Sequence, residues 1–187
     1  EFAGIVCVAG PSVTPCSTGN CRQAAGEELW RSDGTAEGTE RLEDIYLGEI
    51  SSSPAYLTVF DGLLYFAATS SLHGRELWRT NGSPGDARLV SLKGHEQGIA
   101  AGTASSNPTE MTAANDGSRM YFAAEDRYRG RELWMVHSLS ELANSNDRLR
   151  DLERIDIVPG ADSSNPSGFE AGDFGKVYFK AFTPTTG

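Results

Sequence analysis

One five-residue phrase recurs three times in this chain of 187 residues and constrains its fold more than any other feature. The phrase is Gly-x-Glu-Leu-Trp, at residues 26–30, 74–78 and 130–134. A second phrase, Tyr-Phe-Ala-Ala, begins at Tyr65 and Tyr121, and each tyrosine stands 13 positions before the next tryptophan. Two matched phrases at matched spacing indicate an internal repeat, which has to be interpreted before any single motif.

The repeat divides the chain into units with a period of about 57 residues. We therefore expect one repeat domain over residues 1–187, with units at about 2–59, 60–115 and 116–173 and a partial unit at 174–187. The chain begins and stops inside a unit, because Gly187 aligns with the glycine that opens the phrase in the second and third units. A piece of a longer protein is therefore expected.

Each unit contains four short segments rich in aromatic and β-branched residues, which are typical of strands. In the second unit they are residues 55–60, 65–68, 75–80 and 87–92. Asp-Gly and Asn-Gly pairs at 61–62 and 81–82 stand between them, where tight hairpins favour such residues. The prediction is an all-β fold, a β-propeller-like array of about three four-stranded antiparallel blades, part of a larger propeller. A β-sandwich or a β-solenoid is the alternative.

The acidic composition excludes one class of partner. The formal net charge is -10 and the isoelectric point about 4.7. Nucleic acid binding needs a basic stripe, and none is present in the sequence. The acidity is explained more simply as an aid to solubility. No apolar run is long enough for a membrane-spanning helix, so we expect a chain that does not span a membrane.

The three cysteines indicate the compartment. Cys16 and Cys21 enclose four residues that include turn formers, within an insert of ten residues that only the first unit has. A small disulfide loop would place the protein outside the cytosol, whereas a zinc site would need more ligands than the scattered histidines supply. We expect a Cys16–Cys21 disulfide and assign no role to Cys7.

The first unit carries the most complete form of the motif. Residues 26–35 read Gly-Glu-Glu-Leu-Trp-Arg-Ser-Asp-Gly-Thr, and Gly38-Thr39 follows. With the later Ser-Ser-Ser-Pro at 51–54, this resembles the ELWxxDGT repeat family of secreted, propeller-like proteins, best known from bacteria. The resemblance covers nearly the whole chain, and the motif degrades in the second unit and is mostly lost after Trp134. It implies a fold and an extracytoplasmic location (secreted, periplasmic or lumenal), but no catalytic residue.

Several recurring side chains have both a functional and a structural interpretation. Trp30, Trp78 and Trp134 could stack on sugars, but packing between blades is favoured. The three glutamates of the phrase could line a cation site, although salt bridges or backbone caps are favoured. The turn at Asp33 resembles a sialidase Asp-box or a calcium loop, yet Trp30 precedes it and too few oxygen ligands follow, which favours a structural turn. No catalytic, cofactor or metal site is assigned.

The predicted strand directions place the loops on two faces. The loop after each second strand should share one face with the blade-to-blade connections, and the tight Asp-Gly turns should lie on the other. Loops whose sequence differs between units of one constant framework commonly carry binding residues. Loops that merely tolerate sequence changes would show the same differences. The candidate binding residues on the first face are Ser70, His73, Asn107, Asp126, Arg127, Tyr128 and Asn165.

No nucleophile elbow, phosphate-binding loop or histidine-centred set is present. We therefore expect a non-catalytic interaction or scaffold module that docks on a larger extracytoplasmic assembly and has a protein partner. A carbohydrate-binding or sugar-processing propeller, with a glycan as ligand, is the alternative.

Overall fold

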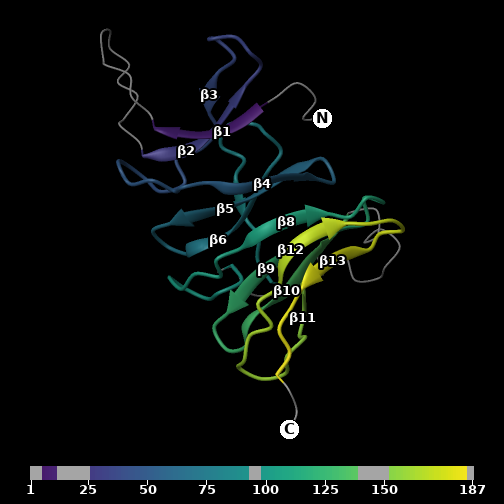
Figure 1. Cartoon of the computed structure of the whole chain (residues 1–187). Helices are drawn as coiled ribbons and strands as arrows, with labels where there is room; N and C mark the ends of the chain where they lie inside the picture. The colour runs from purple at the N-terminus through teal and green to yellow at the C-terminus, as the bar shows by residue number, and fades with distance from the viewer. Residues whose placement is uncertain (1–5, 12–25, 93–97, 139–151, 185–187) are drawn as a thin grey trace.

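The computed structural model describes residues 6–11, 26–92, 98–138 and 152–184, and these ranges contain strands, turns and extended segments but no helix (Figure 1). Four antiparallel sheets, here numbered I to IV, follow one another in chain order. Sheet I contains β1 (Val6–Pro11), β2 (Glu27–Ser32) and β3 (Glu40–Arg41). Sheet II contains β4 (Ala55–Phe60), β5 (Leu63–Ser70), β6 (Gly74–Thr80) and β7 (Arg88–Leu89). Sheet III contains β8 (Thr109–Ala113), β9 (Arg119–Asp126), β10 (Gly130–His137) and β11 (Leu152–Ile155). Sheet IV contains β12 (Ser167–Ala171) and β13 (Val177–Lys180).

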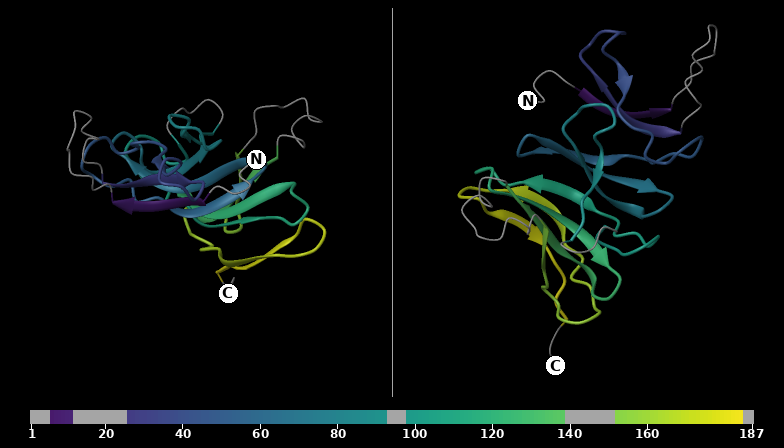
Figure 2. Two further views of the ribbon diagram at one scale, coloured as in Figure 1. Left: turned by 90° about the horizontal axis from the view of Figure 1, so that it is seen from above. Right: turned by 180° about the vertical axis from the view of Figure 1, so that it is seen from behind.

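The all-β prediction is confirmed, and sheets II and III are four-stranded antiparallel sheets with neighbours in chain order. The hairpin predicted at Asp61-Gly62 is present, with φ of 49° and 74°, so both residues are left-handed as a two-residue hairpin turn requires. Among the described residues the four sheets do not close into a ring (Figure 2). In the same part of the chain no helix is long and apolar enough to cross a bilayer.

The fourth strands are shorter than expected. The fourth strand of the second unit was predicted at residues 87–92, but β7 contains only Arg88 and Leu89. One more ladder bond follows, in which the amide of Val90 donates to the carbonyl of Leu77 at 2.9 Å. Beyond it the chain leaves the sheet, and further along the amides of Ile99 and Ala100 donate to the carboxylate of Glu76.

The hydrophobic core lies between successive sheets. Phe66, Ala68 and Trp78 of sheet II pack with Leu29 of sheet I. The alternate residues of the same strands, Tyr65, Ala67 and Leu77, pack with residues of sheet III that include Met111, Phe122 and Trp134. A third cluster joins Ala123 and Leu133 of sheet III to Phe169 of sheet IV. Because side chains of a strand alternate between faces, each middle sheet contributes to two cores.

The first strands of sheets II, III and IV lie side by side: β4 contacts β8, and β8 contacts β12. The hydroxyl of Thr58 on β4 donates to the carbonyl of Met111 on β8 at 3.1 Å. The amide of Gly168 on β12 donates to the carboxylate of Glu110 on β8. Sheets II, III and IV therefore meet along their first strands.

Candidate binding face

The loops after the second strands and the segments that join the sheets lie together, as expected. We call this side the connection face and define it by loops 71–73 and 127–129 and by the Ser-Ser-x-Pro connectors at 51–54, 105–108 and 163–166. The amide of Arg75, next to the first loop, donates to Ser105 at 2.9 Å, and that of Arg131 donates to Ser163 at 2.9 Å. The opposite side, with the tight turns at 61–62, 33–34 and 81–82, is the turn face.

A buried glutamate fastens each connector to the preceding sheet. Glu76 has no exposed surface, yet its carboxylate accepts four hydrogen bonds. Three come from the amides of Ile99, Ala100 and Ser106, at 2.9, 3.1 and 3.1 Å, and the fourth from the hydroxyl of Ser106 at 2.7 Å. A buried carboxylate without such donors would be strongly destabilising. The four donors therefore explain why a glutamate is tolerated in the core here.

The same arrangement recurs in the other two units. Glu28 and Glu132 are also fully buried. Each accepts from the amide and the hydroxyl of one connector serine, Ser52 for Glu28 and Ser164 for Glu132. Burial raises the pKa of Glu28 above its ordinary value and that of Glu76 to about 7, and the serine hydroxyls and the backbone amides partly oppose both shifts.

The arginine that precedes the glutamate in the phrase binds the other connector of its sheet. Arg75 donates through Nη1 to the carbonyl of Ser53 at 2.9 Å, and Arg131 donates to that of Asn107 at 2.9 Å. Each accepting residue belongs to the connector that enters the arginine's own sheet. The third strand of sheets II and III therefore holds the connector before it through the arginine and the connector after it through the glutamate.

The glycine that opens the phrase allows this close approach. A methyl group on Gly130 would lie 2.5 Å from the Oγ of Ser163 and 2.8 Å from the carbonyl oxygen of Asp162. One on Gly74 would lie 2.6 Å from the carbonyl oxygen of Ala104. Both glycines also have positive φ, which strains other residues. The phrase thus combines a close contact and two connector bonds in three consecutive residues.

Most of the predicted binding residues have structural partners. Ser70 is buried and its hydroxyl lies 3.2 Å from Nδ1 of His73. Asp126 accepts from the amides of Tyr128 and Arg129, at 2.8 and 2.7 Å, and also from Arg154. These three predicted residues therefore support the loops that carry them.

The two asparagines shape the connectors. Asn107 and Asn165 are left-handed, with φ of 45° and 46°, and precede a proline, and asparagine tolerates this conformation better than most residues. The side-chain Nδ2 of Asn107 donates to the carboxylate of Glu125 at 2.5 Å. Their predicted place in the connections between sheets is confirmed. The predicted Cys16–Cys21 disulfide lies outside the described residues.

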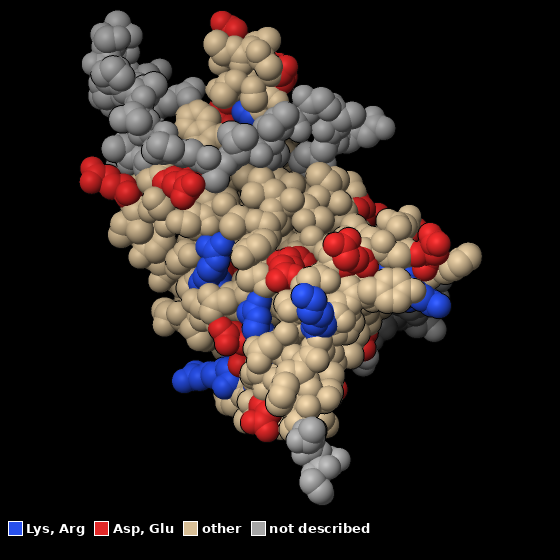
Figure 3. Space-filling model, viewed as in Figure 1, with Lys and Arg blue, Asp and Glu red and all other residues tan. Residues whose placement is uncertain are grey.

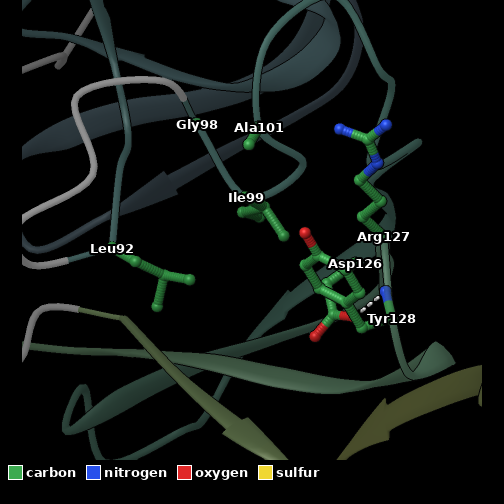
Figure 4. A pocket seen from close by; sticks show the side chains of 7 residues that line it. All are labelled: Leu92, Gly98, Ile99, Ala101, Asp126, Arg127 and Tyr128. Atoms are coloured by element: carbon green, nitrogen blue, oxygen red, sulfur yellow. Dashed lines mark hydrogen bonds between the residues drawn. The ribbon is translucent and has the colours of Figure 1, made fainter.

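Arg127 and Tyr128 project from the connection face. Tyr128 is 77% exposed, and Leu72 in the neighbouring loop is 70% exposed. Tyr128 borders a hollow of about 170 Å³ that Leu92, Ile99 and Ala101 line from the connection after sheet II. Figure 4 shows Tyr128 extending towards Ile99, while the guanidinium of Arg127 points away from Tyr128. The hollow has mainly apolar walls and a cation beside it.

The three tryptophans do not form an exposed row. Trp134 is 1% exposed, and its indole nitrogen donates to the carbonyl of Ala124 at 3.0 Å. Trp78 is half-buried in the core between sheets I and II, and Trp30 is half-buried. The sugar-stacking platform considered from the sequence is therefore not formed by these residues.

On the turn face, Asp33 closes its own turn. Its Oδ1 accepts from the amide of Thr35 at 2.9 Å and from the Thr35 hydroxyl at 2.7 Å, and these bonds lower the pKa of Asp33. Its carboxylate lies against Gly38, where a methyl group would be 2.0 Å from Oδ1.

Nowhere in the described ranges do three or more His, Cys, Asp or Glu side chains gather as metal ligands would. Acidic and basic side chains are interspersed on the surface in Figure 3.

The sequence favoured salt bridges or backbone caps for the three glutamates. The structure shows that they accept from backbone amides, and it adds the serine hydroxyls, which the sequence analysis did not identify. The signal was present, because a serine pair stands two positions before a proline in all three connectors. Comparison with protein-family models, curated proteins and solved structures found no match to this chain.

Proposed function

We propose that this chain is a non-catalytic interaction module that docks a protein partner on its connection face. The sheets belong to a propeller-like array in this proposal, and the setting is extracytoplasmic. The face-to-face cores and the adjacent first strands support the array, because blades of a propeller pack in this way around an axis. The setting rests on the expected cysteine loop and on the resemblance to secreted repeat proteins.

The observation that carries the proposal is that the connection face has two sets of side chains, one that holds the structure together and one that projects into solvent. The groups that could do acid–base chemistry there, the three glutamates, His73 and Asp126, are occupied by bonds that hold connectors and loops. Leu72, Arg127 and Tyr128 instead project into solvent from loops of different composition. Exposed loops on a rigid frame are where binding residues are commonly found.

The exposed side chains indicate the chemistry of the partner. Tyrosine and arginine are enriched among residues that dominate the energy of protein interfaces, and they act best beside a pocket that excludes water. The hollow beside Tyr128 has room for one apolar side chain of a partner. Arg127 is exposed and is available to a carboxylate next to that side chain. A peptide segment with one apolar anchor and an adjacent acidic residue matches these features.

A displayed peptide library tests the proposal. The whole chain is panned against the library, and enriched peptides are retested on the R127A/Y128A double variant. We expect apolar-acidic peptides that lose binding by about tenfold or more on the double variant, as expected for hot-spot residues. Val59→Ala, at a side chain that is 53% exposed at the end of β4 near the turn face, is the matched control.

A glycan array in parallel examines the carbohydrate alternative. Glycan binding without enriched peptides would overturn the proposal in favour of a sugar-binding module. Peptides that bind the double variant as well as the original chain but lose binding to the Val59 variant would show that the turn face is the docking surface.

A further inference from the structure

The two arginines of the repeated phrase stand at equivalent positions in neighbouring sheets. Arg75 on β6 pairs with Thr69 of β5, and Arg131 on β10 pairs with Glu125 of β9. Both arginine side chains are half-buried. A difference between their contacts is therefore caused by the residues around each arginine and not by its place in the sheet.

The guanidinium of Arg131 is held by three acceptors. Its Nη1 donates to the carbonyl of Asn107 at 2.9 Å, and its Nη2 donates to the hydroxyl of Thr109 and to the carbonyl of Ala123, the latter at 3.2 Å. These acceptors lie in the connector that enters sheet III and in the first two strands of that sheet. Sheet III and its connector therefore supply these partners.

Sheet III also supplies negative charge to Arg131. Burial lowers the pKa of Arg131. The groups that oppose this shift are the carboxylate of Glu125, the phenol of Tyr56 and the carboxylate of Glu110. Glu125 lies on β9 and Glu110 on β8. The cation of Arg131 thus has two carboxylates of its own sheet nearby.

Arg75 makes the first of these contacts, because its Nη1 donates to the carbonyl of Ser53 at 2.9 Å. Its Nε and Nη2 have no hydrogen-bond partner in the part of the chain that the structure describes, and neither atom is shut off from solvent. Burial lowers the pKa of Arg75, and the phenol of Tyr56 opposes this shift. Because tyrosine is neutral at about pH 7, Arg75 is a half-buried cation to which the described residues present no carboxylate.

Three differences between sheets II and III account for the open donors of Arg75. At each of three matching positions, sheet III has an acceptor or a charge that sheet II lacks. The matching residues are Thr109 and Ala55, Glu110 and Tyr56, and Glu125 and Thr69. Tyr56 and Glu110 also share a left-handed backbone, with φ of 57° and 55°. The open donors are therefore a property of sheet II itself.

The two open nitrogens define the chemistry of a ligand. Nε and Nη2 lie along one edge of the planar guanidinium and can donate two parallel hydrogen bonds, which the two oxygens of a carboxylate accept. A phosphate would fit the same edge, but the formal net charge of the chain is -10, and this charge opposes a dianion more than a monoanion. Tyr56 is 46% exposed and offers its ring to the carbon atoms that carry the carboxylate. A carboxylate is therefore the better match.

We propose that Arg75 is a binding site for one carboxylate, which pairs with Nε and Nη2 of the guanidinium beside the ring of Tyr56. The carboxylate is supplied by a free organic acid or by the C-terminus of a protein. The site uses neither Arg127 nor Tyr128. It is therefore independent of the docking function proposed above.

The experiment follows the arginine Nε–H signals of the whole ¹⁵N-labelled chain by NMR while sodium acetate is added. Sodium chloride at the same ionic strength is the control, because a single ion cannot accept two parallel bonds. The signal that Arg75→Lys removes is assigned to Arg75. We expect a saturating shift of this signal with acetate, a much smaller response to chloride, and no shift of the Arg131 signal, because Arg131 already has its acceptors.

Two threonine variants test the site without removing the arginine. Ala55→Thr supplies the hydroxyl that Thr109 supplies in sheet III, and this hydroxyl should occupy Nη2 of Arg75. We expect acetate affinity to fall by about tenfold or more, because the ligand loses one hydrogen bond from a charged donor. Val59→Thr adds the same side chain to the same strand at a position that is 53% exposed, and it should leave acetate affinity unchanged.

A short peptide with a free C-terminal carboxylate and its amidated form separate the two sources of the ligand. Tighter binding of the free-acid peptide than of acetate assigns the carboxylate to a protein C-terminus, whereas equal binding assigns it to small acids, and either result supports the site. Equal binding of the amidated peptide would overturn it.

Three further outcomes would overturn the proposal: no saturating shift at Arg75, an equal response to chloride, or unchanged acetate affinity in Ala55→Thr. The double variant R127A/Y128A should bind acetate as the original chain does. Failure of the docking function and failure of the carboxylate site are therefore observed separately.

Discussion

The two faces of this molecule are stabilised over different ranges of sequence. On the turn face, Asp33, Asn81 and Asp116 each accept from an amide two residues ahead, so each turn closes within itself. On the connection face, Glu76 binds Ser106 thirty residues away, and Glu132 binds Ser164 over a separation of 32. The first kind of bond shapes a loop, and the second kind fixes a connector against the preceding sheet.

This difference explains how one five-residue phrase can organise the chain. A local turn is closed by its own residues, so a sequence change in one turn does not disturb the next sheet. A buried glutamate depends on a connector from elsewhere in the sequence, and the connector's own carbonyl then binds the second strand of the next sheet, as Ser52 does with the amide of Thr69 at 2.8 Å. Damage on the connection face should therefore loosen contacts between sheets, whereas damage on the turn face should remain local.

The largest effect is expected from removing a buried carboxylate. Glu76→Ala leaves three buried donors without an acceptor, the amides of Ile99 and Ala100 and the hydroxyl of Ser106, and we expect a loss of unfolding free energy on the order of 3 to 5 kcal/mol. Asp116→Ala on the turn face is the matched control and should change stability much less, because its partner amide can bond to water. Urea unfolding followed by tryptophan fluorescence measures both. Similar losses in the two variants would contradict the division between the faces.

The titration of Glu76 should give the next largest effect. Burial raises its pKa from 4.5 to about 7. Its contribution to stability is therefore fully present below about pH 4.5 and is lost as the pH rises through about 7, a change on the order of 3 kcal/mol. Urea unfolding at pH 5 and pH 8 should show a lower stability at pH 8, and Glu76→Gln should reduce the difference. An undiminished difference in the glutamine variant would assign the pH dependence to other groups.

Much of the fold followed from local sequence, because strands and tight turns are determined by neighbouring residues. The aromatic segment at 65–68 and the pair Asp61-Gly62 were sufficient to predict β5 and its hairpin. The bond between Glu76 and Ser106 could not be derived in the same way, because it depends on where a distant connector runs. Serine is usually exposed, so its burial could be inferred only from its recurrence before each Asn-Pro or Ser-Pro pair.

The candidate site was predicted less completely for the same reason. Asp126 was proposed for binding because it is charged and lies in a variable loop, but it closes that loop and pairs with Arg154 at 3.2 Å. The partner of a charged side chain depends on tertiary contacts that a single sequence does not show. Tyr128 and Arg127, from the same loop, do project from the face, and the composition of the loop gave no means of separating these two from Asp126.

The smallest and sharpest comparison is between two glycines with the same backbone conformation. Gly130 on the connection face has φ of 69°, and Gly117 on the turn face has φ of 70°, so alanine introduces similar backbone strain of about 1 kcal/mol at both positions. Only at Gly130 does the new methyl group meet other atoms, 2.5 Å from the Oγ of Ser163, whereas nothing lies within 4 Å of it at Gly117. We expect Gly130→Ala to lose about 1 to 3 kcal/mol more than Gly117→Ala in urea unfolding, which is the usual range for overpacking. Since the strain cancels in the difference, that excess measures the contact between the phrase and its connector. Equal losses would mean that the connector can move aside, and the bonds of Glu132 and Arg131 would then have to hold it without the close approach at Gly130.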